Sequence, residues 1–106
     1  MWGMGELITS TARVRTERAG RYGKQMASHF GRKIEAEWDP DAMRGQLVFP
    51  SDGAPTTCDM LCGEDVLMLT LQATPENVER MEGVVGRHLE RFGERDGLVV
   101  TWVRGG

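Results

Sequence analysis

The chain has 106 residues, of which 40% are hydrophobic and 27% are charged, and its net charge is −3. This length suits one domain, and these fractions are ordinary for a soluble globular protein. No stretch approaches the roughly 20 apolar residues that a membrane-spanning helix needs, and no apolar segment typical of a signal peptide follows the start. We therefore expect a cytoplasmic protein, with residues 1–5 as a disordered N-terminus and residues 6–106 as a single α+β domain.

The first predicted elements are a strand and a helix. Apolar and polar residues alternate in residues 6–16, a pattern typical of a strand with one inward face. Thr16 then suits a helix N-cap, with Glu17 in the first turn. The helix that follows carries an apolar stripe at three- and four-residue spacing, formed by Ala19, Tyr22, Met26 and Phe30.

Four more strands, joined by short turns, are predicted in residues 34–38, 46–50, 56–62 and 66–73. Thr74, Pro75 and Glu76 form a helix start, with a cap, a proline at the first helical position and an acid after it. The apolar stripe of this second helix consists of Val78, Met81, Val85, Leu89 and Phe92. A last strand is predicted in residues 98–103. The order β-α-β-β-β-β-α-β predicts an antiparallel sheet of about six strands with both helices packed on one face.

The two cysteines are expected to be unpaired. Cys58 and Cys62 lie four residues apart in one predicted strand, which separates their Cα atoms by about 13 Å at roughly 3.3 Å per residue. A disulfide needs Cα atoms within about 7 Å of each other. We therefore expect reduced thiols that pack in the core.

The charge is unevenly distributed along the chain. Residues 13–33 contain seven basic side chains and a single acidic one, Glu17, whereas the rest of the chain is acidic. This basic segment is interpreted either as the solvated face of one helix or as a surface that steers an anionic ligand or an acidic partner. Nucleic acid is not expected as a partner, because the pI is about 5.4 and no aromatic residues are interleaved with the basic ones.

Motifs of common catalytic sites are absent from the chain. It contains no GxGxxG, GxxxxGK, GxSxG or HExxH sequence. Glu35, Glu37 and Asp39 alternate along one predicted strand and are interpreted as its solvent side, in preference to an acid–base pair or a cation site. The sequence therefore favours a binding module without a cofactor over an enzyme.

Two histidines stand at equivalent places in the two predicted helices. An offset of 59 residues superposes His29 on His88 and Arg32 on Arg91. If a two-fold axis relates the halves, the histidines face the groove between the helices, roughly 12 Å apart along it. If a translation relates them, they are level but point the same way. Neither arrangement lets both bind one metal ion, whose bonds to nitrogen are about 2.1 Å long, so no metal is expected.

Two interpretations of the histidines and arginines in these helices remain open. In the first, each histidine packs its ring and makes one hydrogen bond. In the second, His29, Arg32, His88 and Arg91 form a ligand-binding site, in which the guanidinium groups supply the charge that attracts carboxylate or catecholate groups. Packing is the favoured interpretation.

A wider pattern consists of His29-Phe30, Lys33, Trp38, Phe49-Pro50, Cys58, His88-Leu89-Glu90-Arg91-Phe92 and Trp102. In this pattern the chain resembles a bacterial family, domain of unknown function 2218, over about residues 8–104. The likeness is most specific in the second helix. Where the family often has Phe-Pro-Phe-Gly, this chain has a longer and more polar turn, FPSDGAP.

The resemblance implies an α+β fold of the TATA-binding-protein-like class and no established activity. Members occur alone, or joined to or encoded beside siderophore-interacting flavin reductases. This implies an accessory role in iron–siderophore metabolism, with such a reductase as a partner. The expected function is therefore the binding of a small ligand or a protein in that metabolism, and the alternative is a structural or dimerisation module with no ligand.

A homodimer is also expected. The sheet face away from the helices is predicted to carry an apolar patch of Val48, Leu61, Met68, Val99 and Val103. Such a patch is larger than a monomer normally exposes to water. Two chains are therefore expected to join through this face or through their edge strands.

Overall fold

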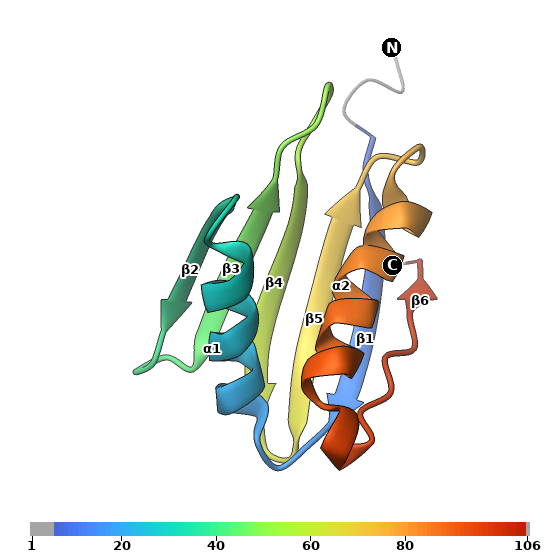
Figure 1. Ribbon diagram of the computed structural model, residues 1–106. Helices are drawn as coiled ribbons and strands as arrows, with labels where there is room; N and C mark the ends of the chain where they lie inside the picture. The colour runs from blue at the N-terminus through green and yellow to red at the C-terminus, as the bar shows by residue number, and fades with distance from the viewer. Residues whose placement is uncertain (1–5, 106) are drawn as a thin grey trace.

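A computed structural model describes residues 6–105 and contains one six-stranded sheet with two helices on the same face (Figure 1). The strands are β1 (Ile8–Arg15), β2 (Glu35–Asp39), β3 (Arg44–Phe49), β4 (Thr56–Gly63), β5 (Val66–Ala73) and β6 (Val103–Arg104). Their order across the sheet is β2-β3-β4-β5-β1-β6, and every neighbouring pair is antiparallel. The predicted α+β class and the predicted order of strands and helices are thus confirmed. The expectation for residues 1–5 lies outside the described residues.

The two helices, α1 (Ala19–Phe30) and α2 (Val78–Phe92), lie side by side and run in opposite directions across the sheet (Figure 1). α1 covers β2, β3 and β4, α2 covers β1, and both helices contact β5. No helix in the described part of the chain is long and apolar enough to cross a membrane.

The core lies between the sheet and the helices. Every second residue of β5 points into it, so Leu67, Leu69 and Leu71 are fully buried. Both predicted apolar stripes face this core, which confirms the helical periodicity. Phe92, at the end of the second stripe, is only partly buried.

The tryptophan that follows each helix packs against a glycine of that helix. A Cβ atom added to Gly23 of α1 would lie 2.6 Å from the ring of Trp38, and one added to Gly86 of α2 would lie 3.2 Å from the indole nitrogen of Trp102. The bare backbone at these two positions therefore lets the large rings approach the helices closely.

Both helices begin later than their sequence signals predict. The Thr16 hydroxyl accepts a hydrogen bond from the Arg18 N–H at 3.0 Å, so it caps the turn before α1. The Thr74 hydroxyl accepts one from the side chain of Asn77 at 3.1 Å, and α2 starts only at Val78. In each case the capping residue stabilises a turn that leads into the helix.

The predicted strand in residues 98–103 forms only at its end. Only Val103 and Arg104 pair with β1. The preceding segment is held by α2: the Val100 N–H donates to the Glu90 carboxylate at 3.0 Å, and the Trp102 indole N–H donates to the Glu82 carbonyl at 3.0 Å. The apolar residues of this segment therefore contact α2, although their composition favours a strand.

Glu82 of α2 joins three elements inside the protein. It is 9% exposed and accepts hydrogen bonds from the Ser10 hydroxyl of β1 at 2.6 Å and from the Arg104 guanidinium of β6 at 2.8 and 3.0 Å. A buried carboxylate is tolerated only when its oxygens are paired in this way. The network therefore anchors the short strand β6.

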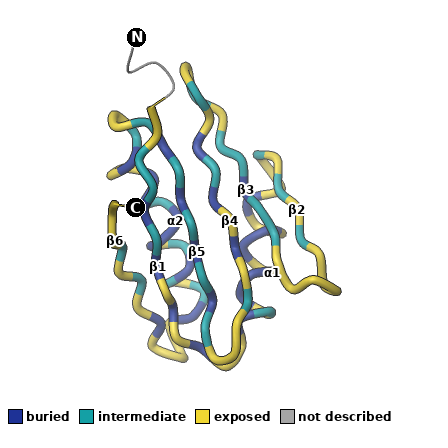
Figure 2. Tube along the Cα trace, turned by 180° about the vertical axis from the view of Figure 1, so that it is seen from behind, coloured by how far each residue is buried: buried dark blue, intermediate teal, exposed yellow. Residues whose placement is uncertain are grey.

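The face of the sheet away from the helices is open to solvent (Figure 2). Leu61 of β4 and Met68 of β5 are direct partners on this face, as the predicted apolar patch requires. Val48 and Val103 pair instead with threonines of β4 and β1, and Val99 lies outside the strands. Val48 and Val103 thus each lie beside a threonine and not beside another residue of the predicted patch.

Candidate ligand-binding groove

The antiparallel helices bring His29 of α1 and His88 of α2 together. Their ring centroids lie 5.1 Å apart, and the ring planes are inclined by 44°. The rings are therefore much closer than the roughly 12 Å expected along the groove from the rise of the helix backbone. Side chains on a helix tilt toward its N-terminus, so on antiparallel helices the two imidazoles lean toward each other and close the gap.

Three phenylalanines surround this pair. Phe30 lies 4.8 Å from the His88 ring, Phe92 lies 5.2 Å from the His29 ring, and Phe49 of β3 lies 5.3 Å from Phe30, measured between ring centroids. All five aromatic rings of this cluster are residues on which the family resemblance rests. The contacts agree with the interpretation that the histidine rings pack.

The tautomer of His88 follows from one hydrogen bond. Its Nδ1 lies 2.7 Å from the carbonyl oxygen of Val84, one turn earlier in α2. A carbonyl oxygen can only accept, so Nδ1 carries a hydrogen, and Nε2 is the ring nitrogen that can offer a lone pair.

His29 differs from His88 in its surroundings. His29 is exposed, but desolvation by its neighbours lowers the pKa of its imidazole, and the charges of His88, Arg32 and Lys33 lower that pKa further. Within residues 6–105 the ring of His29 makes no hydrogen bond. We therefore expect a neutral ring with an available lone pair at pH 7.

A groove of about 590 Å³ opens beside His29. Its lining consists of Arg21, Lys24, Gln25, Ser28, His29, Arg32 and Phe92. The lining contains three permanent cations, one amide and one hydroxyl, but no carboxylate. Such a set of donors suits an anionic ligand.

Only some of the four predicted site residues lie at the groove. His29 and Arg32 line the groove, and His88 contacts His29 from the other helix. α1 ends at Phe30, so Arg32 lies in the turn that follows it. Arg91 is exposed on α2 and is not part of the lining.

The sequence interpretation did not assemble the rest of the groove. Arg21, Lys24, Gln25 and Ser28 recur at three- and four-residue intervals along α1, so they form a polar stripe beside its apolar one. That spacing is the signal that could have identified them. Nothing in the sequence shows that Phe92 of α2 would close the other side.

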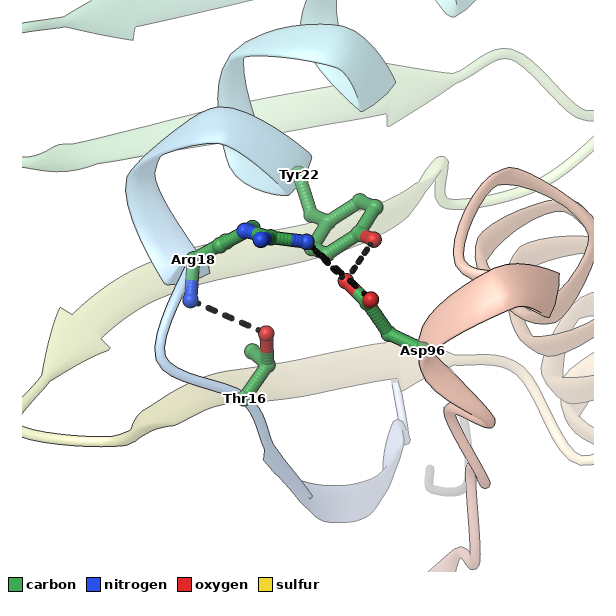
Figure 3. A network of polar contacts seen from close by, with 4 residues as sticks. All are labelled: Thr16, Arg18, Tyr22 and Asp96. Carbon is green, nitrogen blue, oxygen red and sulfur yellow. Dashed lines mark hydrogen bonds and ion pairs between the residues drawn. The ribbon is translucent and has the colours of Figure 1, made fainter.

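A second polar cluster joins the start of α1 to the 3₁₀ turn Glu94–Asp96 that follows α2 (Figure 3). Arg18 donates to both carboxylate oxygens of Asp96 at 3.0 Å, and the Tyr22 hydroxyl donates to the same carboxylate. This hydrogen bond to Asp96 raises the pKa of Tyr22. Because its charges are already paired, the cluster acts as a structural link and leaves no charge free for a ligand.

The acidic strand and the cysteines form no site. Glu35, Glu37 and Asp39 are exposed on edge strand β2. Among residues 6–105, no group of three or more His, Cys, Asp or Glu side chains is placed to hold a metal ion. Cys58 and Cys62 are free, as predicted, and burial raises the pKa of the Cys58 thiol to about 12. That thiol is therefore inert at neutral pH.

Comparisons with known proteins identify a matching family and a similar solved structure. The model of a family described as "Uncharacterized protein conserved in bacteria (DUF2218)" matches residues 11–103. The chain is also similar to the NMR structure of PA4090 from Pseudomonas aeruginosa, with 32% sequence identity and a TM-score of 0.70. That similarity covers 91% of this chain and 95% of the other. No curated protein matches the chain.

Proposed function

This chain belongs to DUF2218, a family of uncharacterised bacterial proteins, and we propose that it is a non-enzymatic module that binds a small anionic ligand in the groove beside α1. The observation that carries the proposal is the lining of that groove. Arg21, Lys24 and Arg32 contribute three positive charges with no carboxylate among them. The groove is thus cationic in a protein whose net charge is −3.

Charge and shape together restrict the ligand class. Positive charges gathered in a concave surface raise the local concentration of anions and speed their capture. Phe92 and His29 add aromatic faces to the lining, against which a planar group can pack. The groove therefore suits planar groups with carboxylate or phenolate oxygens.

These groups occur in iron chelates, which supports the more specific part of the proposal. Catecholate and carboxylate groups of a siderophore present negative oxygens to guanidinium groups. We propose that the module serves iron–siderophore metabolism and that a siderophore-interacting flavin reductase is its protein partner. The family resemblance supports this role, and the cationic groove supplies a place for the chelate.

Titration with a ferric catecholate siderophore, followed by calorimetry, tests this proposal. Arg32→Gln removes a cation of the groove and should weaken binding at least fivefold, because a charge-assisted hydrogen bond is lost. Arg91→Gln is the matched control, since it removes the same charge outside the groove and should leave the affinity unchanged. Equal affinities for all three proteins, or no binding by the wild type, would contradict the proposal.

A structural module that forms a homodimer is the second candidate. It is favoured by the open sheet face, where Leu61 is 50% exposed and pairs with Met68. This candidate requires self-association and no ligand, so it is distinguished from the first by sedimentation and by the titration above.

A further inference from the structure

The distance between the two histidine rings matches that of two imidazoles on one metal ion. With a metal–nitrogen bond of about 2.1 Å and about 1.15 Å more to the ring centre, the centroids lie about 5.3 Å apart at a tetrahedral angle and about 4.6 Å apart at a right angle. The observed separation of His29 and His88, 5.1 Å, lies between these values. The separation of the rings is therefore compatible with both imidazoles binding one ion.

The hydrogen bond of His88 also resembles that of a metal ligand. Imidazoles that bind metals commonly donate their other ring N–H to a carbonyl or carboxylate oxygen, which fixes the tautomer and the ring orientation. Here the Val84 carbonyl accepts from Nδ1 at 2.7 Å, which leaves Nε2 as the donor of an electron pair. Val84 thus orients His88 before any ligand arrives.

The surrounding charges decide what kind of metal species fits. No carboxylate or thiolate completes a metal cluster with the histidines within residues 6–105. Arg21, Lys24 and Arg32 line the adjoining groove and repel a bare divalent cation. A metal that arrives inside an anionic chelate is attracted by the same charges.

From this geometry we propose that His29 and His88 together bind a divalent transition metal held in a carboxylate chelate with two adjacent open coordination positions. The imidazoles fill those positions, and the oxygens of the chelate face the cations of the groove. Imidazole selects ions such as Ni²⁺, Cu²⁺ and Zn²⁺, whereas Fe³⁺ prefers oxygen ligands. The inference rests on the proposed anion-binding function, to which it adds a metal and two protein ligands.

Ni²⁺–nitrilotriacetate is a suitable probe, because the chelator is anionic and leaves two adjacent positions of the metal open. The untagged protein is titrated with this complex and, separately, with metal-free nitrilotriacetate, and binding is measured by calorimetry. We expect wild type to bind the nickel complex at least tenfold more tightly than the free chelator. His29→Gln and His88→Gln should each abolish that difference, and Cys62→Ser, which changes a partly buried thiol, should preserve it.

Two further measurements distinguish loss of the metal site from loss of the fold. The amide spectrum of each variant by NMR shows whether the fold is intact, and displacement of the nickel complex from wild type by free imidazole tests the histidines without any substitution. Histidine variants that bind the complex as wild type does, or a complex that imidazole does not displace, would overturn the metal site.

Comparison of the arginine variant with the histidine variants distinguishes a failure of this inference from a failure of the proposed function. If Arg32→Gln weakens the binding of both chelator forms but the histidine variants weaken neither, the anion groove stands and the metal site fails. If the histidine variants lose the nickel complex but Arg32→Gln binds both forms as wild type does, the metal site stands and the anion groove fails.

Discussion

At the scale of single residues, Glu82 carries a negative charge into the interior. The hydrogen bonds from Arg104 lower the pKa of its carboxyl below the ordinary value of 4.5, burial opposes that shift, and the hydrogen bond from Ser10 adds to it. Because the pKa is lower in the folded protein, the paired carboxylate stabilises the fold above the unfolded-state pKa. That contribution is lost as the pH falls through the folded-state pKa.

Glu82→Gln should therefore destabilise the protein by about 1.5–3 kcal/mol at pH 7, because hydrogen bonds to a charged group are lost. The difference between variant and wild type should begin to shrink as the pH falls below about 4.5 and should vanish at lower pH, where the carboxyl of the folded wild type takes up its proton. Urea unfolding at several pH values measures this. Glu76→Gln, an exposed change before α2, is the control, and a difference that does not vary with pH would contradict the prediction.

At the scale of elements, the two ends of the α2 stripe have different roles. Leu89 is fully buried, whereas Phe92 is only partly buried and lines the groove. Sequence periodicity places both residues on one apolar stripe, which is predicted to face the sheet. Phe92 packs against the edge of the core, and its ring also lies 5.2 Å from the ring of His29 on α1, measured between centroids.

Leu89→Ala should cost about 2–5 kcal/mol, because it leaves a cavity in the core. Phe92→Ala should cost clearly less than Leu89→Ala, because solvent can fill the space that its ring leaves. Thermal unfolding of the two variants compares these costs. If Phe92→Ala is the more destabilising change, the orientation of the end of α2 described above is wrong.

At the scale of the whole molecule, self-association through the open sheet face remains a prediction. If a homodimer uses this face, Leu61→Glu should dissociate it, because Leu61 and Met68 are paired apolar side chains there. Sedimentation of wild type and variant at micromolar concentrations measures the effect. A dimer that survives Leu61→Glu points to edge-strand pairing, and a wild type that sediments as single chains at every concentration would contradict the homodimer.

The sequence by itself determined the class, the order of elements and the apolar stripes of the two helices. Alternation with a period of two and stripes with a period of 3.6 are properties of local chain geometry, so they can be read without knowing what lies opposite. The same local patterns placed His29 on one helix and His88 on the other, but they also placed Arg32 on the first helix, which ends at Phe30. They also made the free state of Cys58 and Cys62 predictable.

Only the tertiary structure decided how close the histidines lie and what surrounds them. Their separation depends on the relative direction of α1 and α2, which no spacing within one helix records, and on side-chain tilt, which antiparallel packing turns into a contact of 5.1 Å. The same holds for residues 98–102, whose hydrogen bonds to α2 replace the expected strand pairing. Local propensity is set by neighbours in the chain, whereas the groove and the end of the sheet are set by partners that are distant in sequence.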